Sequence, residues 1–149
     1  MMNLYALHTQ IGGKDTIMLT LLDAAAMAEV QNQNAILGLL KDAQGKVIHE
    51  NIIYNPAFVA FFHKTMLVFA ELAPAINASA NDSLMYIIDE RCKSTDKPEK
   101  HDIIGSFEVE NGMLVKESYQ PNKNYQFISE NGLFKLPAQI ERVLFMALV

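Results

Sequence analysis

Residues 102–119 read DIIGSFEVENGMLVKESY, and this stretch decides the fold class. Asn111-Gly112 lies between two runs of strand-forming residues, and Asn-Gly supplies the two positive φ angles that a type I′ hairpin turn requires. With this turn, Val109 pairs with Leu114, and apolar and acidic side chains then fall on opposite faces. The apolar face holds Ile103, Phe107, Val109 and Leu114, and the polar face holds Glu108, Glu110 and Glu117. The stretch therefore predicts an antiparallel hairpin with one buried and one solvated face.

The same Glu-Asn-Gly tripeptide returns in residues 125–136, YQFISENGLFKL. The flanking residues of the two copies share little, and no other segment recurs at this spacing. The repetition therefore indicates turn chemistry used twice, and it predicts a second, shorter hairpin without any repeat architecture.

The N-terminal half contains further hairpin and helix patterns. Two apolar runs, 3–9 and 15–21, flank Gly12-Gly13 and predict a hairpin. Residues 22–32 are rich in Ala, Met and Glu and predict a short helix, the alternative being one longer helix over 15–30. Strands are expected at 35–41 and 46–53, with Gly45 closing the loop between them in the left-handed conformation. The first of these strands is apolar on both faces, as a central strand is.

Asn55-Pro56 predicts the start of the main helix, because Asn caps a helix and Pro fits its first turn. The window 57–76 is long enough to cross a bilayer, but Lys64 lies in its middle, where a charge costs about 2.5–3.5 kcal/mol. We therefore expect a buried helix, closed or kinked at Pro74. The other expected elements are a loop at 77–82, a strand at 83–90, a polar stretch at 91–102 that is exposed for much of its length, and a last helix after Pro137. The apolar stripe of that last helix comprises Ile140, Val143, Leu144, Ala147 and Leu148.

These elements predict an α+β fold: a single domain with an antiparallel sheet of hairpins and a long central helix and a C-terminal helix packed on it. Residues 35–62, AILGLLKDAQGKVIHENIIYNPAFVAFF, resemble the opening of a PAS sensor domain, where a hairpin leads into an Asn-Pro-Ala-Phe-like helix start. The chain departs from that pattern at residues 50–53, ENII. The element order also resembles the roadblock and profilin-like group, which includes dimerising scaffolds and regulators of small GTPases.

Composition narrows the classes of function. The chain has 149 residues, half of them hydrophobic and 19% charged, as expected for one globular domain. Its formal net charge is −5, with 17 acidic and 12 basic residues, which argues against a nucleic-acid partner. Cys92 is the one cysteine, so no intramolecular disulfide forms and a reducing cytoplasm is the expected compartment. The first residues show no signal-peptide pattern, and we expect no membrane segment and no cofactor.

Three features of the sequence contain residue types that carry chemistry. Gly12-Gly13-Lys14 lacks the spacing of a phosphate loop and is expected to be a plain turn. The four histidines, His8, His49, His63 and His101, show no metal-ligand spacing, so no metal site is expected. Cys92 and His101 share one polar loop, and a thiol beside an imidazole is a candidate nucleophile pair. No third group that would orient them is evident.

The candidate binding residues are Asp89, Arg91, His101, Tyr119 and Tyr125. Asp89 and Arg91 end an apolar strand beside a long loop, a frequent place for function. The plainer interpretation is a solvated strand end with a surface ion pair. Tyr119 and Tyr125 flank a loop of amide groups that suits contacts with a partner.

Two hypotheses of different classes follow. The first is a non-catalytic interaction module that forms a homodimer, because eight Met and eight Phe residues can supply an adaptable apolar patch. The second is a small-molecule sensor of PAS or profilin type, which requires an enclosed apolar pocket of roughly 300 Å³ or more. A catalytic function would require an activated Cys92 or a cleft formed by Asp89, Arg91 and His101.

Overall fold

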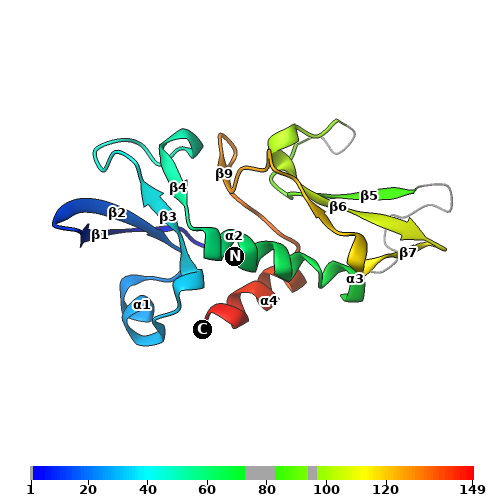
Figure 1. Cartoon of the computed structure of the whole chain (residues 1–149), viewed down its shortest axis with the longest axis horizontal. Helices are drawn as coiled ribbons and strands as arrows, with labels where there is room; N and C mark the ends of the chain where they lie inside the picture. The colour runs from blue at the N-terminus through cyan, green and yellow to red at the C-terminus, as the bar shows by residue number, and fades with distance from the viewer. Residues whose placement is uncertain (1, 73–82, 94–96) are drawn as a thin grey trace. The chain divides into compact units, whose positions relative to one another are not determined.

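The structure is a computed structural model that describes residues 2–72, 83–93 and 97–149. The chain divides into two units, Met1–Phe62 with Glu141–Val149, and His63–Ile140. Antiparallel sheets and helices follow one another along the chain (Figure 1), which confirms the α+β class. The strands are shared among separate sheets rather than gathered into one. The expectation of a single domain stays a prediction.

The first unit contains a four-stranded antiparallel sheet in the order β1-β2-β3-β4. Its strands are β1 (Tyr5–Ile11), β2 (Lys14–Thr20), β3 (Ile36–Leu40) and β4 (Ile52–Tyr54), drawn in blue to green in Figure 1. Gly12 and Gly13 have φ angles of 60° and 78° and close the β1–β2 hairpin, as predicted. Strand β3 lies between β2 and β4, as its two apolar faces predicted.

Helix α1 (Ala24–Val30) is short because both of its ends are capped. The Asp23 side chain accepts a hydrogen bond of 2.8 Å from the Ala26 N–H, and Gln31 ends the helix in the left-handed conformation. The short helix is therefore confirmed. The longer alternative over 15–30 is wrong, because β2 occupies the first part of that range.

The second strand of the predicted 35–53 hairpin is much shorter than expected. Residues 41–51 form a loop that ends in the 3₁₀ helix η2 (His49–Asn51), and only Ile52–Tyr54 pair with β3. The Asn51 side chain holds this loop: its amide donates to the backbone oxygens of Asp42 and Lys46, and its oxygen accepts from the Asp42 N–H. Gly45 is not left-handed; a Cβ there would lie 2.7 Å from Asn51 Nδ2, so glycine is needed for space.

Helix α2 (Pro56–Met66) begins as predicted. Asn55 Oδ1 accepts from the Ala57 N–H at 3.1 Å, and the Asn55 amide donates to the Ile36 oxygen at 2.9 Å. The buried side of α2 carries Phe58 and Phe62, and the helix α3 (Phe69–Leu72) follows. No helix among the described residues is both long enough and apolar enough to cross a membrane. Pro74 and the predicted loop at 77–82 lie outside the described residues.

The second unit contains a sheet with β6 (Ile103–Glu110) at its centre. Strand β5 (Leu84–Ile88) pairs with one side of β6, and β7 (Met113–Leu114) and β8 (Gln120–Pro121) also pair with it. The register Val109↔Leu114 and the φ angles of 53° at Asn111 and 75° at Gly112 confirm the predicted hairpin. The 3₁₀ helices η3 (Lys100–Asp102) and η4 (Lys116–Ser118) precede β6 and follow β7.

An irregularity in β6 changes one predicted core residue. Ile87 pairs with Gly105, whereas Ile88 pairs with Ile103, so the register shifts by one residue at Ile104. Such a bulge reverses the alternation of side chains. Ile104 is therefore fully buried and Ile103 only half-buried, which corrects the prediction that Ile103 occupies the core.

The second Glu-Asn-Gly copy forms the predicted short hairpin of β9 (Ile128–Ser129) and β10 (Gly132–Leu133). Its turn differs from the first, because the two central residues are Glu130 and Asn131 and the positive φ angle, 101°, falls on Gly132 alone. The Asn131 N–H donates to Ser129 Oγ at 3.1 Å. The same three residues therefore serve two different turns.

Helix α4 (Ala138–Leu148) buries a narrower stripe than predicted. Ile140, Leu144 and Leu148, spaced four apart, are buried. Val143 and Ala147 were predicted to be core residues and are exposed, because the burial follows a single line along the helix.

Candidate functional site

Arg91, three residues after the end of β5, is the centre of a buried polar cluster in the second unit. Its side chain is 4% exposed, and Nε donates to Asp102 Oδ1 at 3.0 Å. The two terminal nitrogens donate to four backbone oxygens, those of Phe127, Gly132, His101 and Gln126. A guanidinium carries five N–H donors. All five of them are occupied by the protein itself, so the side chain offers no donor to a ligand.

Asp89 is the second charged member of this cluster and is 1% exposed. Its Oδ2 accepts a 2.6 Å hydrogen bond from the Tyr125 hydroxyl and lies 3.5 Å from Arg91 Nε. Its Oδ1 accepts from the backbone N–H groups of Arg91 and Lys135, at 2.9 and 3.0 Å. Burial raises the pKa of this carboxyl, and the hydrogen bond from Tyr125 is the largest effect in the opposite direction.

Tyr125 closes the cluster from the other side. Its ring is buried, and the Arg91 guanidinium carbon lies 5.5 Å from the ring centroid. Burial, with the negative charge of Asp89, places the pKa of the Tyr125 hydroxyl well above its ordinary value. The hydroxyl therefore keeps its proton and acts as a hydrogen-bond donor to Asp89.

His101 joins the cluster mainly through its backbone oxygen, which accepts from Arg91. Its Nε2 is buried, lies 3.8 Å from Asp102 Oδ2 and makes no hydrogen bond with another residue that the structure describes. The structure thus brings together four of the five predicted residues, Asp89, Arg91, His101 and Tyr125. With Asp102 they are called the Arg91 cluster here.

The interpretation of Asp89 and Arg91 as a solvated strand end with a surface ion pair is wrong, because both side chains are buried. Residues 91–102 were predicted to be exposed for much of their length, and Lys93, Lys97, Glu99 and Lys100 are exposed. The side chains at the two ends of the stretch, Arg91 and Asp102, are buried. Asp102 was missed from the sequence. The sequence signal for Asp102 was an acidic residue directly before the apolar run IIGSF. In the structure the Asp89 backbone N–H donates to the Asp102 backbone oxygen at 2.8 Å, so the two residues are neighbours.

Tyr119, the fifth predicted residue, lies apart from the Arg91 cluster. Its hydroxyl is 2.7 Å from His63 Nδ1, and its ring centroid lies 5.0 Å from that of Phe107. Burial lowers the pKa of His63 to about 4 and raises the pKa of Tyr119. Near neutral pH both groups are therefore uncharged, and the pair is a neutral hydrogen bond.

This arrangement suits a structural role better than a chemical one. In the Arg91 cluster the charges face each other and backbone groups, and a catalytic group must instead reach a substrate. The Cys92 N–H donates to the Asp89 oxygen at 3.0 Å, which places Cys92 in the turn after the cluster. No group of three or more His, Cys, Asp or Glu side chains within residues 2–72, 83–93 and 97–149 is placed to hold a metal ion.

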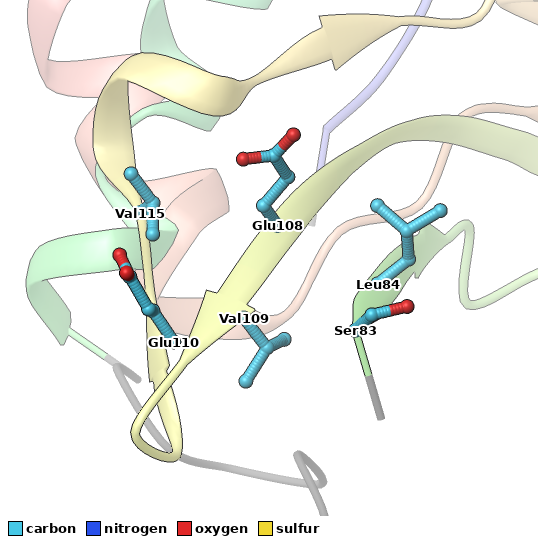
Figure 2. Close-up of a pocket in the computed structure, with 6 residues that line it drawn as sticks. All are labelled: Ser83, Leu84, Glu108, Val109, Glu110 and Val115. Carbon is cyan, nitrogen blue, oxygen red and sulfur yellow. The ribbon is translucent and has the colours of Figure 1, made fainter. Parts of the chain in front are cut away.

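The solvent face of the second sheet carries two hollows. One, of about 480 Å³, is lined by Ser83, Leu84, Glu108, Val109, Glu110 and Val115. Figure 2 shows the Glu108 side chain standing over β6 between Leu84 of β5 and Val115. The second hollow, of about 410 Å³, shares Leu84, Glu108 and Val115 and adds Ser106, Glu117, Ser118 and Gln120. These carboxylates are exposed, as the hairpin pattern predicted.

The outer side of α4, in the first unit, is an exposed apolar surface. Met146 is 67% exposed and Phe145 is 43% exposed, and Val143 and Val149 are exposed beside them. We call these four residues the α4 face. Helix α4 thus buries one apolar line and exposes another, and exposed apolar surface of this kind is typical of a site that binds a partner.

Comparisons with protein-family models, with curated proteins and with solved structures found no match.

Proposed function

We propose that the protein is a non-catalytic cytoplasmic interaction module that binds a second copy of itself through the α4 face. The observation that carries this proposal is the exposure of Phe145 and Met146 on a helix whose opposite side is buried. Burying one such side chain contributes roughly 1.5–3 kcal/mol, so two copies of this surface supply a substantial driving force. Methionine adapts its shape to an apposed surface, which suits self-association.

The α4 face is held on a fixed support. The Asn32 amide donates to the last carbonyls of the helix, at 3.3 Å to Ala147 and 3.2 Å to Leu148. A capped and packed helix loses little conformational entropy when it binds, which favours association.

Charge also favours an antiparallel contact between two α4 helices. Arg142 is exposed in the middle of α4, and in a two-fold antiparallel pair centred on Phe145 and Met146 it lies near the carbonyl end of the partner helix. A cation near a helix C-terminus is stabilising. The same contact occurs twice in a two-fold dimer, so its contribution is doubled.

The non-catalytic part of the proposal rests on the Arg91 cluster, whose donors are all used within the protein. The alternative, a small-molecule sensor, calls for an enclosed apolar pocket. The two hollows at β6 are lined by exposed carboxylates and do not match that description. We therefore favour the interaction module.

Light scattering after size exclusion, with native mass spectrometry on the same sample, tests the proposal. We expect a dimer that persists on dilution, and a monomer for Met146→Glu, because the substitution puts a charge in the interface. Met113→Glu is the matched control, since Met113 is 54% exposed on β7 in the other unit. A wild-type monomer at all concentrations contradicts the proposal, and a monomer that retains an unexpected mass favours the sensor.

A further inference from the structure

We propose that the solvent face of the β5–β6–β7–β8 sheet binds an extended segment of a partner protein that is rich in lysine or arginine. This goes beyond self-association, because it concerns the other unit of the chain and a different partner. The site, called the acidic groove here, is lined chiefly by Leu84, Ser106, Glu108, Glu110, Val115 and Glu117.

The shape of the acidic groove suits a chain rather than a compact ligand. The two hollows share Leu84, Glu108 and Val115, so they adjoin one another across the sheet. In Figure 2 the Glu108 side chain rises from the strand at its centre. The lining residues Leu84 of β5 and Gln120 of β8 pair with Glu108 and Ser106 of β6, so strands on both sides of β6 contribute to it.

The lining carries negative charge. Among the residues that the structure describes, it contains three carboxylates, Glu108, Glu110 and Glu117, and no basic side chain. The neighbouring cation, Lys116, is 2.7 Å from Glu71 and pairs with it. An occupant that brings positive charge is therefore complementary to the groove, whereas a nucleic-acid backbone is repelled.

The spacing of the carboxylates points to an extended occupant. Glu108 and Glu110 lie two residues apart on one strand, and alternate side chains of a strand are separated by roughly 7 Å along the same face. Basic side chains at every second position of an extended segment repeat at the same interval. Leu84, 46% exposed, and the half-buried Val115 offer apolar surface for the aliphatic stems of lysine and arginine.

The test uses the full chain and two fluorescein-labelled heptapeptides, one of alternating lysine and serine and one of alternating glutamate and serine. Fluorescence anisotropy at 20 mM NaCl should show binding of the lysine peptide and none of the glutamate peptide. Affinity should fall at least tenfold at 500 mM NaCl, because exposed charge pairs are screened. The double variant Glu108→Gln, Glu117→Gln should lose at least tenfold in affinity.

The matched control is Glu29→Gln, Glu130→Gln, which removes the same charge from exposed positions outside the groove. It should bind the lysine peptide as the wild type does. An equal loss in the control overturns the proposal, because attraction by the net charge then explains the binding, and so does an absence of wild-type binding. Met146→Glu should bind the peptide normally, so a failure of the dimer proposal and a failure of the acidic groove are distinguishable.

Discussion

The hydroxyl of Tyr125 donates a 2.6 Å hydrogen bond to Asp89, and both side chains are buried in the second unit. The contact joins the end of β5 to a segment that contains little regular strand. Arg91 adds bonds to backbone oxygens of the same segment, at Gln126, Phe127 and Gly132. Side chains of the Arg91 cluster thus do for residues 125–132 what ladder hydrogen bonds do for a paired strand.

Tyr125→Phe removes the hydroxyl and leaves the ring in place. We expect a loss of about 1–3 kcal/mol in the free energy of unfolding near pH 7, because a buried carboxylate loses its shortest hydrogen bond. The pKa of Asp89 is already raised in the folded state, so its ionisation opposes folding, and the variant increases that opposition. The difference from wild type should therefore shrink as the pH falls through the raised pKa of Asp89.

Urea unfolding monitored by circular dichroism at several pH values measures this difference. Tyr86→Phe is the control, since Tyr86 is 54% exposed on β5, and it should unfold like the wild type. A deficit for Tyr125→Phe that stays constant from neutral to acidic pH would count against the role assigned to the Asp89 carboxylate.

Arg91→Lys keeps the positive charge and loses the planar arrangement of five donors. A lysine cannot reach Asp102 and four backbone oxygens together, so buried acceptors lose their partners. We expect a loss of about 3–5 kcal/mol in the free energy of unfolding, because each buried acceptor left without a donor costs about 1–3 kcal/mol and at least two are left. Arg142→Lys on the exposed side of α4 should change it by less than about 0.5 kcal/mol. Similar values for the two variants would refute the structural role of Arg91.

Local turn and cap chemistry made much of the fold predictable. The Asn111-Gly112 turn and the Asn55 cap each depend on residues close in sequence, and each was predicted correctly. The prediction of a strand at 46–53 was wrong, because the side chain of Asn51 forms hydrogen bonds with backbone groups up to nine residues away and holds most of this range in a loop. The bulge at Ile104 was not predicted, because one inserted residue leaves the apolar pattern of the strand almost unchanged.

The sequence predicted the location of the Arg91 cluster but not its burial. Charged residues at the end of an apolar strand pointed to Asp89 and Arg91, and both belong to the cluster. Their burial depends on carbonyl oxygens of residues 126–132, more than thirty positions along the chain, which no local pattern reveals. The α4 face was missed because an apolar residue in a helix pattern does not say whether it faces the core.

Gly112→Ala tests the conformational requirement of the first turn. Gly112 has a φ angle of 75°, and a Cβ there meets nothing within 4 Å, so backbone conformation alone opposes the substitution. We expect a loss of about 1–2 kcal/mol in the free energy of unfolding. Gly112→Asn should lose less, because Asn adopts the left-handed conformation more readily. If alanine and asparagine prove equally harmless in urea unfolding, the turn is not under this constraint.

His63→Gln should change how stability depends on pH. Burial lowers the pKa of His63 from 6.5 to about 4, so between these values the unfolded chain binds the extra proton and the folded chain does not. Wild-type stability from this source is complete above pH 6.5 and is lost as the pH falls toward 4. The loss should amount to about 1–2 kcal/mol, since solvent partly reaches the ring and reduces the full value of roughly 1.4 kcal/mol per pKa unit.

Urea unfolding between pH 4 and pH 7 measures this loss as the difference between the wild type and His63→Gln. Tyr119→Phe is the matched control: it removes the 2.7 Å hydrogen bond to His63 and leaves the imidazole buried. Because burial is the cause of the lowered pKa, Tyr119→Phe should keep the acid-side loss, whereas His63→Gln should remove it. If Tyr119→Phe also removes the loss, the hydrogen bond to Tyr119 is what sets the pKa of His63, and the assignment to burial is wrong.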